Sequence, residues 1–255
     1  MASEQWLSNA RATLDHIERT QIGAIRKAAD VMAGAIAKGN LVHTFGSGHA
    51  HMPVEELYPR IGGIVGFHPV TYIGLTYFTN ILGDGGVFTL SWLERIEGLA
   101  AQILKSHELR SGDVMLLFSH SGVNGVVIDM AIESKKRGMP VVAVTSAAAS
   151  AKKPTRHSSG KRLFEHADHV IDTGLPAEDA AVSVEGLKEK VGPGSSLAFI
   201  TVANLISCEV AKGLVKRGAK PFVNVSYNQP EQFASAEEHM DAMLGEYRKR
   251  VYGRA

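Results

Sequence analysis

Two short segments rich in Gly, Ser and His carry residue types that could bind an anion. The first, Gly46-Ser47-Gly48-His49, follows the apolar run 41–45, and the second, Ser119-His120-Ser121-Gly122, follows the apolar run 114–118. Small residues let a chain turn sharply from a buried strand into a helix, whose free N–H groups and dipole attract negative charge. Two such turns in one chain favour a phosphorylated ligand.

Other polar residues begin predicted helices or follow predicted strands in the same way. Thr145 and Ser146 follow the apolar run 141–144, and Asn204 is a polar residue on an apolar helix that needs a hydrogen-bond partner. The alternative is that these residues only cap helices. We expect the following residues to bind the substrate or its phosphate: Ser47, Gly48, His49, Ser119, His120, Ser121, Gly122, Asn124, Thr145, Ser146, Ser195 and Asn204.

Glu55 and Glu56 follow the first turn by less than three helical turns. A helix beginning near His49 would hold at least one of these carboxylates beside a ligand at the strand ends, where it could act as a base. His51 lies four residues before Glu55 and could pair with it, so Glu55, Glu56 and His51 are the predicted catalytic residues. Alternatively, the glutamates lie on a solvated helix face, or His49 and His51 begin a metal site. No third metal ligand can be assigned, and we expect neither a metal nor a cofactor.

Alternating helical and apolar segments would position these residues. An amphipathic helical pattern covers residues 4–38, and buried strands are predicted at 41–45, 64–70, 114–118, 141–144 and 169–171. Helices are predicted at 52–60, 90–105, 124–137 and 193–216, the last with Ser195 or Ser196 as its N-cap, and a charged helix at 231–255. Loops are predicted at 71–86 and 146–167, and an edge strand at 221–226. This alternation implies an α/β fold with a doubly wound, five-stranded parallel sheet.

Length and composition limit the possible functions. The chain has 255 residues, with 27 Lys and Arg against 26 Asp and Glu, and no basic stripe that favours nucleic acid as a partner. No uninterrupted apolar run approaches the roughly 18 residues of a membrane-spanning helix. We expect a cytoplasmic protein of one domain, residues 1–255, with a helical arm at 1–38, a core at 39–220 and a tail at 221–255. The single cysteine, Cys208, lies in an apolar pattern and is predicted to be buried.

The basic run in the loop 146–167 has two interpretations. It contains Lys152, Lys153, Arg156, Lys161 and Arg162. A solvated loop is the favoured interpretation, and the alternative is an electrostatic funnel for an anionic substrate.

The order of the motifs Gly46-x-Gly48, Ser119-x-Ser121-Gly122 and Thr145-Ser146 resembles the sugar-isomerase (SIS) phosphosugar-binding domain over about residues 35–215. This resemblance implies a five-stranded parallel sheet, a 6-phosphate held by the Ser119 loop, and sites completed across a dimer. The chain departs from the family at Ala50, where Ser is usual, and at Asn124, where Thr is usual.

Three further segments resemble branches of the family. The run 46–51 followed by Glu55-Glu56 is similar to a branch that includes an N-acetylglucosamine-6-phosphate dehydratase, and Glu55-Glu56-Leu57 is similar to the heptose-phosphate isomerases. Gly194-Ser-Ser196 is similar to a turn of the N-acetylmuramate-6-phosphate etherases.

We therefore expect a lyase that removes the C2 proton of an N-acetylhexosamine 6-phosphate and eliminates water. An aldose–ketose phosphosugar isomerase is the near alternative, because both reactions begin with the same proton transfer. A non-catalytic phosphosugar sensor is the alternative from another class. The long helix at 4–38, apolar on one face, further predicts a homodimer.

Overall fold

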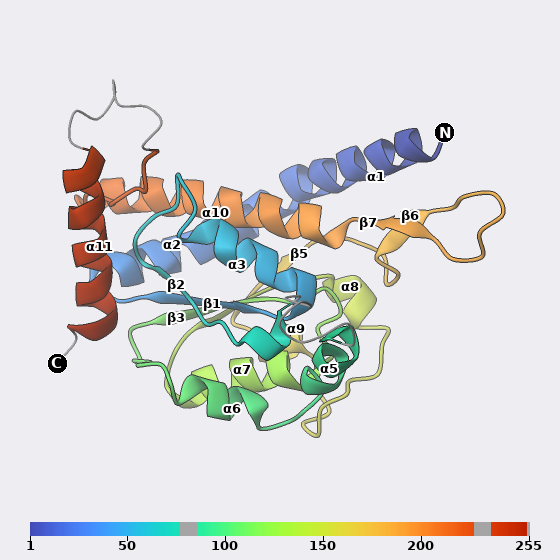
Figure 1. The fold of residues 1–255 in the computed structure, drawn as a ribbon, viewed down its shortest axis with the longest axis horizontal. Coiled ribbons are helices and arrows are strands. Elements are labelled where there is room, and N and C mark those ends of the chain that lie inside the picture. The colour runs from blue at the N-terminus through green and yellow to red at the C-terminus, as the bar shows by residue number, and fades with distance from the viewer. Residues whose placement is uncertain (77–85, 227–235, 254–255) are drawn as a thin grey trace.

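The computed structural model describes residues 1–76, 86–226 and 236–253, and its centre is a five-stranded parallel sheet of order β2-β1-β3-β4-β5 (Figure 1). The strands are β1 Val42–Gly46, β2 Phe67–Pro69, β3 Val114–Phe118, β4 Val141–Thr145 and β5 His169–Asp172. Every residue of β1, β3 and β4 is buried, which explains why β3 and β4 are almost wholly apolar without alternation, whereas β1 also buries His43 and Thr44. The predicted α/β fold and its five-stranded parallel sheet are confirmed.

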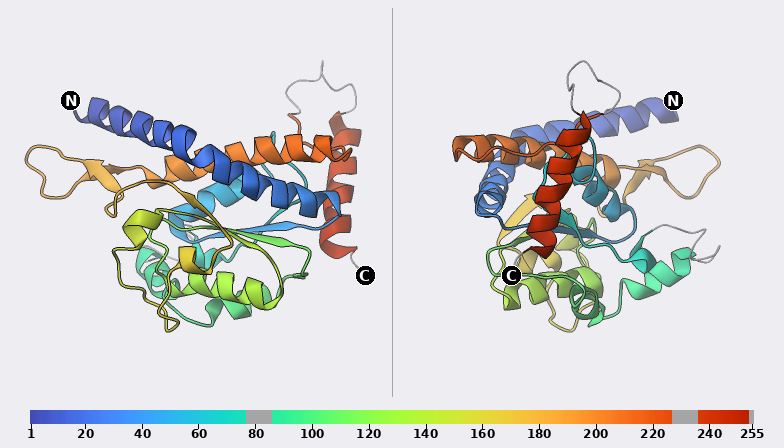
Figure 2. Two further views of the ribbon diagram at one scale, coloured as in Figure 1. Left: turned by 180° about the vertical axis from the view of Figure 1, so that it is seen from behind. Right: turned by 60° about the vertical axis from the view of Figure 1, so that its left-hand side comes forward.

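Helices cover both faces of the sheet (Figures 1 and 2). One face packs against α2 Ile22–Ala37, α3 Met52–Leu57 and α10 Ser195–Lys216, and the other against α6 Leu99–Leu104, α7 Gly125–Lys136 and α9 Leu163–His166. Strand residues alternate between the two hydrophobic clusters, with Leu116 and Phe118 in the first and Met115 and Leu117 in the second. The sheet is therefore buried on both sides, and its strand ends are where a site can open.

The predicted helical stretch 4–38 is confirmed as a nearly continuous helix. Helix α1, Ala2–His16, passes through a π-helical turn, Ile17–Gln21, into α2. Beyond the sheet, α1 projects in the same direction as a small antiparallel pair of strands, β6 Ala180–Val182 and β7 Val191–Pro193 (Figure 1). This pair was not predicted, because three-residue strands are too short to give a hydrophobic period.

Several predicted boundaries are wrong. The second strand is limited to 67–69, since Ile64 instead forms an isolated antiparallel bridge with Val223. The predicted edge strand 221–226 is reduced to this single bridge. The predicted helix 90–105 is two helices, α5 Gly86–Leu93 and α6, because Gly98 adopts a positive φ of 86° between them.

The predicted loops contain short helices. A 3-10 turn, η2 Gly48–His51, precedes α3, and a second one, η3 Ile73–Leu75, lies in the loop 71–86. Helices α8 Ala147–Ser150 and α9 interrupt the loop 146–167. Helix α11, Ala236–Tyr252, forms within the predicted helix 231–255, and Tyr247 stacks on Tyr58. Residues 77–85 of the predicted loop, and residues 231–235 and 254–255 of the predicted helix, lie outside the described residues.

Helix α10 corrects two details of the sequence analysis. Its N-cap is Gly194 rather than Ser195 or Ser196, because Ser195 is the first helical residue and donates its hydroxyl proton to Asp179 Oδ2 at 2.5 Å. Cys208 is exposed, not buried, since it lies on the side of α10 that faces away from the sheet. By length and composition α10 could cross a membrane, but it packs against α2 and α3, with Phe199 and Ile206 in the core.

Candidate functional site

The two predicted anion-binding turns lie beside each other at the carboxyl edge of the sheet. Gly46 at the end of β1 pairs with Phe118 at the end of β3, so the residues that follow, Ser47 and Ser119, begin neighbouring turns. The Ser119 N–H in turn donates to Val144 O of β4, which brings Thr145 and Ser146 to the same edge. The sheet therefore gathers the predicted residues of three strand ends, where parallel sheets commonly bind ligands.

The first turn depends on Gly46. A Cβ atom there would lie 2.0 Å from the carbonyl oxygen of Ala50, so no larger residue fits without moving the backbone. The following residue, Ser47, donates its hydroxyl proton to Glu94 Oε2 at 3.2 Å. The first turn thus places a hydroxyl group against a carboxylate from another part of the chain.

The second turn is held by its own hydroxyl groups. Ser119 Oγ accepts a hydrogen bond from Gly122 N at 3.2 Å, and Thr145 Oγ1 donates to His120 O at 3.3 Å. Gly122 has a positive φ of 61°, and a Cβ atom there would lie 3.0 Å from the side-chain oxygens of Thr145 and Ser150. Ser119 and Thr145 therefore shape the turn.

A cavity of about 320 Å³ lies beside the second turn, lined by Ser121, Val123, Asn124, Lys153, Pro154 and Arg156. We refer to it as the anion cavity. Two of its residues, Lys153 and Arg156, belong to the basic run for which a solvated loop was the favoured interpretation. A hydroxyl, an amide, an ammonium and a guanidinium group around one cavity are donors that suit a phosphate.

Glu94 is a site residue that the sequence analysis missed. It lies just after α5, and its carboxylate meets Ser47 from the first turn and Asn124 from the second. Burial raises the pKa of Glu94, while the hydrogen bonds from Ser47 and Asn124 and the charges of Arg95 and Arg156 oppose that rise. A partly buried carboxylate with a raised pKa beside a cationic cavity is suited to general acid–base chemistry.

The loop that carries Lys153 and Arg156 is fixed by hydrogen bonds from neighbouring helices. His157 Nε2 lies 3.0 Å from Asp129 Oδ1 of α7, and Glu97 accepts hydrogen bonds from the backbone N–H of Ser158 at 2.7 Å and from its hydroxyl at 2.5 Å. These bonds from Ser158 lower the pKa of Glu97. Because His157 follows Arg156 directly, this network fixes the backbone from which the Arg156 side chain extends, together with the hydrogen bond from Arg156 N to Val123 O at 3.0 Å.

The predicted catalytic residues of η2 and α3 do not line the anion cavity, and they face in two directions. His51 is buried, and its Nε2 lies 3.6 Å from Oε1 of the exposed Glu55. Burial lowers the pKa of His51, although Glu55 and a hydrogen bond with the Gly46 backbone raise it. Glu56 instead accepts a hydrogen bond from Asn204 Nδ2 of α10 at 3.3 Å and pairs with Arg60 at 3.5 Å. Their catalytic role stays a prediction.

Three other predicted residues contact the segment 173–179 instead. Ser146 Oγ donates to Leu175 O, and Ser195 donates to Asp179. Burial lowers the pKa of the His120 ring, and the Asp179 carboxylate together with the backbone of residues 176–177 raises it. His49 is exposed, and Gly48 begins η2. Within the described residues, no three His, Cys, Asp or Glu side chains are grouped so that they could hold a metal ion.

Comparison with known proteins identifies the family of the chain. The family model for the SIS domain matches residues 5–146, which include both turns. The chain belongs to the SIS domain family. This confirms the resemblance that the turn motifs indicate.

Relatives of this SIS protein include two that match over nearly their whole length. A UPF0309 protein from Halalkalibacterium halodurans is 36% identical over 241 residues, which cover 92% of this chain and 93% of the relative. A UPF0309 protein from Thermoanaerobacter pseudethanolicus is 33% identical over 251 residues, which cover 97% of this chain and 98% of the relative. The structure of a phosphoheptose isomerase from Francisella tularensis matches with a TM-score of 0.53 and 13% identity, over 82% of this chain and 96% of that one, and so shares its fold.

Proposed function

We propose that this SIS protein acts over residues 1–255 as a single-domain cytoplasmic enzyme that binds a sugar phosphate and transfers its C2 proton, with Glu94 as the base. The observation that carries the proposal is the position of the Glu94 carboxylate. It is partly buried, has a raised pKa, and bonds to residues of both anion-binding turns. This differs from the sequence-based expectation, in which a glutamate of α3 is the base.

The anion cavity would hold the phosphate group. Arg156 presents a planar pair of N–H donors, Lys153 an ammonium group that also donates to Ala177 O at 3.0 Å, and Ser121 and Asn124 neutral donors. A phosphate fixed there would orient the rest of the sugar, so that the reacting carbon meets the base in one geometry. The positive charge of Arg156 also opposes the rise in the pKa of Glu94 and so favours the ionised form that a base requires.

Isomerisation is the reaction that one such base supports by itself. Glu94 removes the proton from C2 of the open-chain aldose, and the electron pair of the C–H bond forms the C1–C2 double bond of an enediolate as the C1 carbonyl oxygen gains the charge. Return of the proton to C1, with proton transfer between the two oxygens, gives the ketose. The name of the similar structure, phosphoheptose isomerase, supports this class.

Dehydration of N-acetylglucosamine 6-phosphate is the second candidate. An N-acetyl group on C2 prevents ketose formation, and loss of the C3 hydroxyl as water then needs a general acid besides the base. The arrangement of the first turn favours this possibility, because Ser47 at its start bonds to Glu94 and His51 at its end pairs with Glu55. The pair of His51 and Glu55 would supply the general acid.

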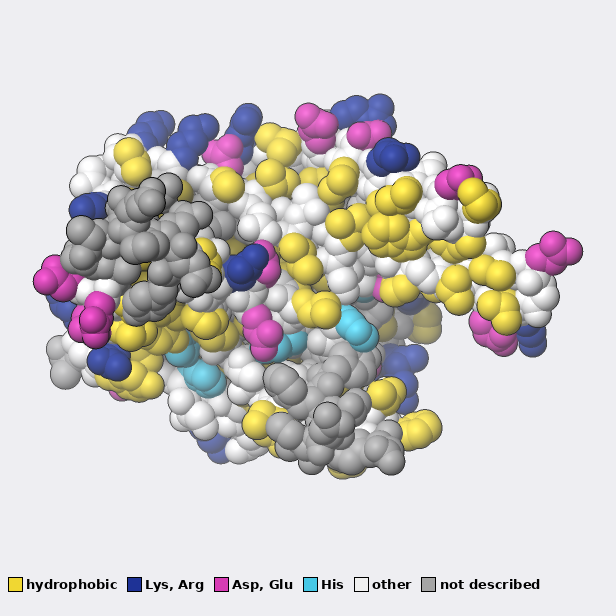
Figure 3. All heavy atoms as spheres, turned by 45° about the horizontal axis from the view of Figure 1, so that its top comes forward, with side chains coloured by type: hydrophobic (Ala, Val, Ile, Leu, Met, Phe, Trp, Pro, Cys, Tyr) yellow, Lys and Arg dark blue, Asp and Glu magenta, His cyan; other side chains and the backbone are white. Residues whose placement is uncertain are grey.

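The outer surface of α1 supports the proposal of a homodimer. Leu7, Leu14, Leu187 and Val191 are exposed hydrophobic residues of α1 and of the β6–β7 region. Figure 3 shows hydrophobic side chains gathered at the end of the molecule where these elements project. We expect twice the mass of one chain in light scattering, and a monomer mass would contradict the dimer.

A substrate comparison tests the proposed function. The purified protein is incubated in deuterated water with N-acetylglucosamine 6-phosphate or fructose 6-phosphate, and proton NMR follows both. Interconversion of fructose 6-phosphate with deuterium uptake supports the isomerase, whereas new vinyl signals from the acetylated sugar support the dehydratase. Line broadening of the sugars without any exchange or turnover would overturn both and indicate a sensor.

A further inference from the structure

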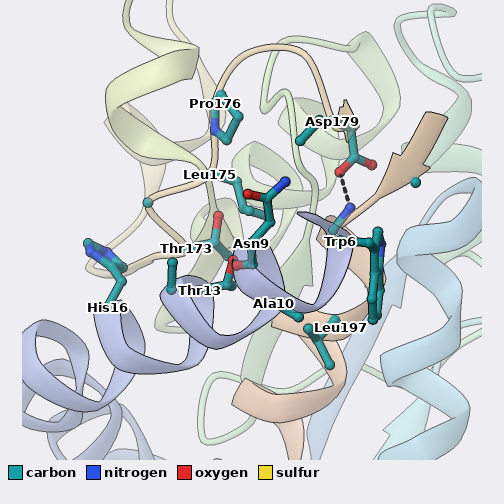
Figure 4. A pocket seen from close by; sticks show the side chains of 15 residues that line it. Trp6, Asn9, Ala10, Thr13, His16, Thr173, Leu175, Pro176, Asp179 and Leu197 are labelled. Carbon is teal, nitrogen blue, oxygen red and sulfur yellow. Dashed lines mark hydrogen bonds between the residues drawn. The ribbon is translucent and has the colours of Figure 1, made fainter. Parts of the chain in front are cut away.

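A second cavity, of about 250 Å³, lies between α1 and the segment 173–179 that follows β5 (Figure 4). Its lining includes Trp6, Asn9 and Thr13 of α1, together with Thr173, Leu175 and Asp179. It shares no lining residue with the anion cavity. We refer to it as the α1 cavity, and none of its lining residues belongs to the proposed catalytic site.

An unsatisfied hydroxyl group marks the α1 cavity as a binding site. Thr173 is only 1% exposed, and its Oγ1 has no hydrogen-bond partner among the residues that the structure describes. A buried hydroxyl without a partner costs about 1–3 kcal/mol, so such groups are rare in folded proteins unless a ligand or water satisfies them. In the view of Figure 4, the Asn9 amide lies between Trp6 on one side and Thr173 on the other. A ligand there would meet polar groups beside an aromatic ring.

The charge of the α1 cavity points to a neutral ligand. Among the described residues, no Lys or Arg lines it, in contrast with the anion cavity and its Lys153 and Arg156. His16 also lines the cavity, and its Nε2 lies 3.3 Å from Asp172 O and from Thr20 Oγ1. The Asp179 carboxylate already accepts hydrogen bonds from the backbone N–H groups of Gly194 and Ser195, at 3.0 and 2.8 Å, and from the Ser195 hydroxyl. Its charge repels an anion, and its hydrogen bonds leave little attraction for a cation.

The volume and the apolar surface of the α1 cavity indicate a ligand that contains a ring. The Trp6 indole is held by a hydrogen bond from Nε1 to Pro193 O at 3.4 Å, and Leu175 and Leu197 supply further apolar surface. A volume of 250 Å³ corresponds to about eight water molecules, at about 30 Å³ each. A pyranose ring presents apolar C–H faces to an aromatic side chain and hydroxyl groups at its edge. We infer that the α1 cavity binds a neutral, hydroxyl-bearing ring the size of a monosaccharide.

Saturation-transfer NMR on the full-length protein tests this inference without any turnover. The probes are glucose and N-acetylglucosamine, each unphosphorylated, titrated at millimolar concentration. We expect saturation of the ring protons for at least one probe. Trp6→Ala should weaken its binding at least about 5-fold, through loss of the aromatic contact. Thr173→Val keeps the shape of the side chain and should weaken binding about 3- to 10-fold, the equivalent of one neutral hydrogen bond.

Two control variants separate the α1 cavity from the rest of the protein. Ser8→Ala changes an exposed polar residue of α1 outside the lining, and Arg156→Ala removes a cation from the anion cavity; neither should alter binding of the neutral sugar. A thermal melt by circular dichroism establishes that each variant is folded. No saturation with either probe, or equal saturation in the wild type, Trp6→Ala and Thr173→Val, would overturn the inference. If the wild type saturates neither probe and Trp6→Ala has a lower mass than the wild type in light scattering, the inference is overturned and the cavity is assigned to a subunit contact.

Discussion

Replacement of Ser47 by Ala should raise the pKa of Glu94 and shift the pH range of activity. The substitution removes the hydroxyl group that donates to Glu94 Oε2 at 3.2 Å. Hydrogen bonds to charged groups contribute about 1.5–3 kcal/mol, and the lower end applies because the Asn124 amide and solvent remain to stabilise the carboxylate. Since about 1.4 kcal/mol corresponds to one pKa unit, we expect a rise of about one unit.

The assay is the pH dependence of kcat/KM for the substrate that the protein turns over. A base must be deprotonated to act, so the acidic limb of the profile should move about one unit to higher pH in Ser47→Ala. Ser121→Ala is the matched control, because Ser121 lines the anion cavity and has no hydrogen bond with Glu94. It should raise KM and leave the limb in place. An unchanged limb in Ser47→Ala, or the same shift in both variants, would refute the role of Glu94.

Three further substitutions test the fold and the loop. Gly46→Ala should destabilise the protein by about 2 kcal/mol or more in urea unfolding, since its Cβ would lie 2.0 Å from Ala50 O, whereas Gly23→Ala, with nothing within 4 Å, should not. Burial would raise the pKa of Asp113, but hydrogen bonds from His43 and from two backbone N–H groups hold it at about 2. The resulting stabilisation of the folded protein is complete above about pH 4 and is lost as the pH falls toward 2. Between these pH values, the free energy of unfolding of Asp113→Asn, measured by urea unfolding, should therefore fall by about 2 kcal/mol less than that of the wild type. His157→Ala releases the loop and should weaken inorganic phosphate binding several-fold by calorimetry, while unchanged affinity would show that Arg156 needs no anchor.

The sequence predicts the sheet because its inner strands have an unusually simple pattern. β1, β3 and β4 are buried on both faces, so each is rich in apolar residues, with His43 and Thr44 as polar exceptions in β1, and each is followed directly by a serine. The turns at Ser47 and Ser119 are local features for the same reason, and the structure brings them together as expected. Short or exposed elements, such as β6 and β7, lack such a pattern and were not predicted.

The site was predicted only in part, because its other members come from contacts between distant segments. Glu94 lies in a helical region without a motif, and only the folded chain places it against Ser47. Likewise, the sequence suggests a solvated loop for Lys153 and Arg156, whereas His157 and its partner Asp129 fix that loop at the cavity. Glu55 and Glu56 are adjacent in sequence, yet one turns toward His51 and the other toward α10.

Deuterium uptake at C2 of the bound sugar 6-phosphate tests the central claim most directly. Wild-type protein and the variants Glu94→Gln, Glu55→Gln and Glu56→Gln are compared by NMR in deuterated water, with phosphate affinity measured in parallel. We predict that Glu94→Gln abolishes exchange while it still binds phosphate, and that at least one of the α3 variants retains exchange. Exchange that persists in Glu94→Gln and disappears in Glu55→Gln or Glu56→Gln would contradict the account and place the base on α3.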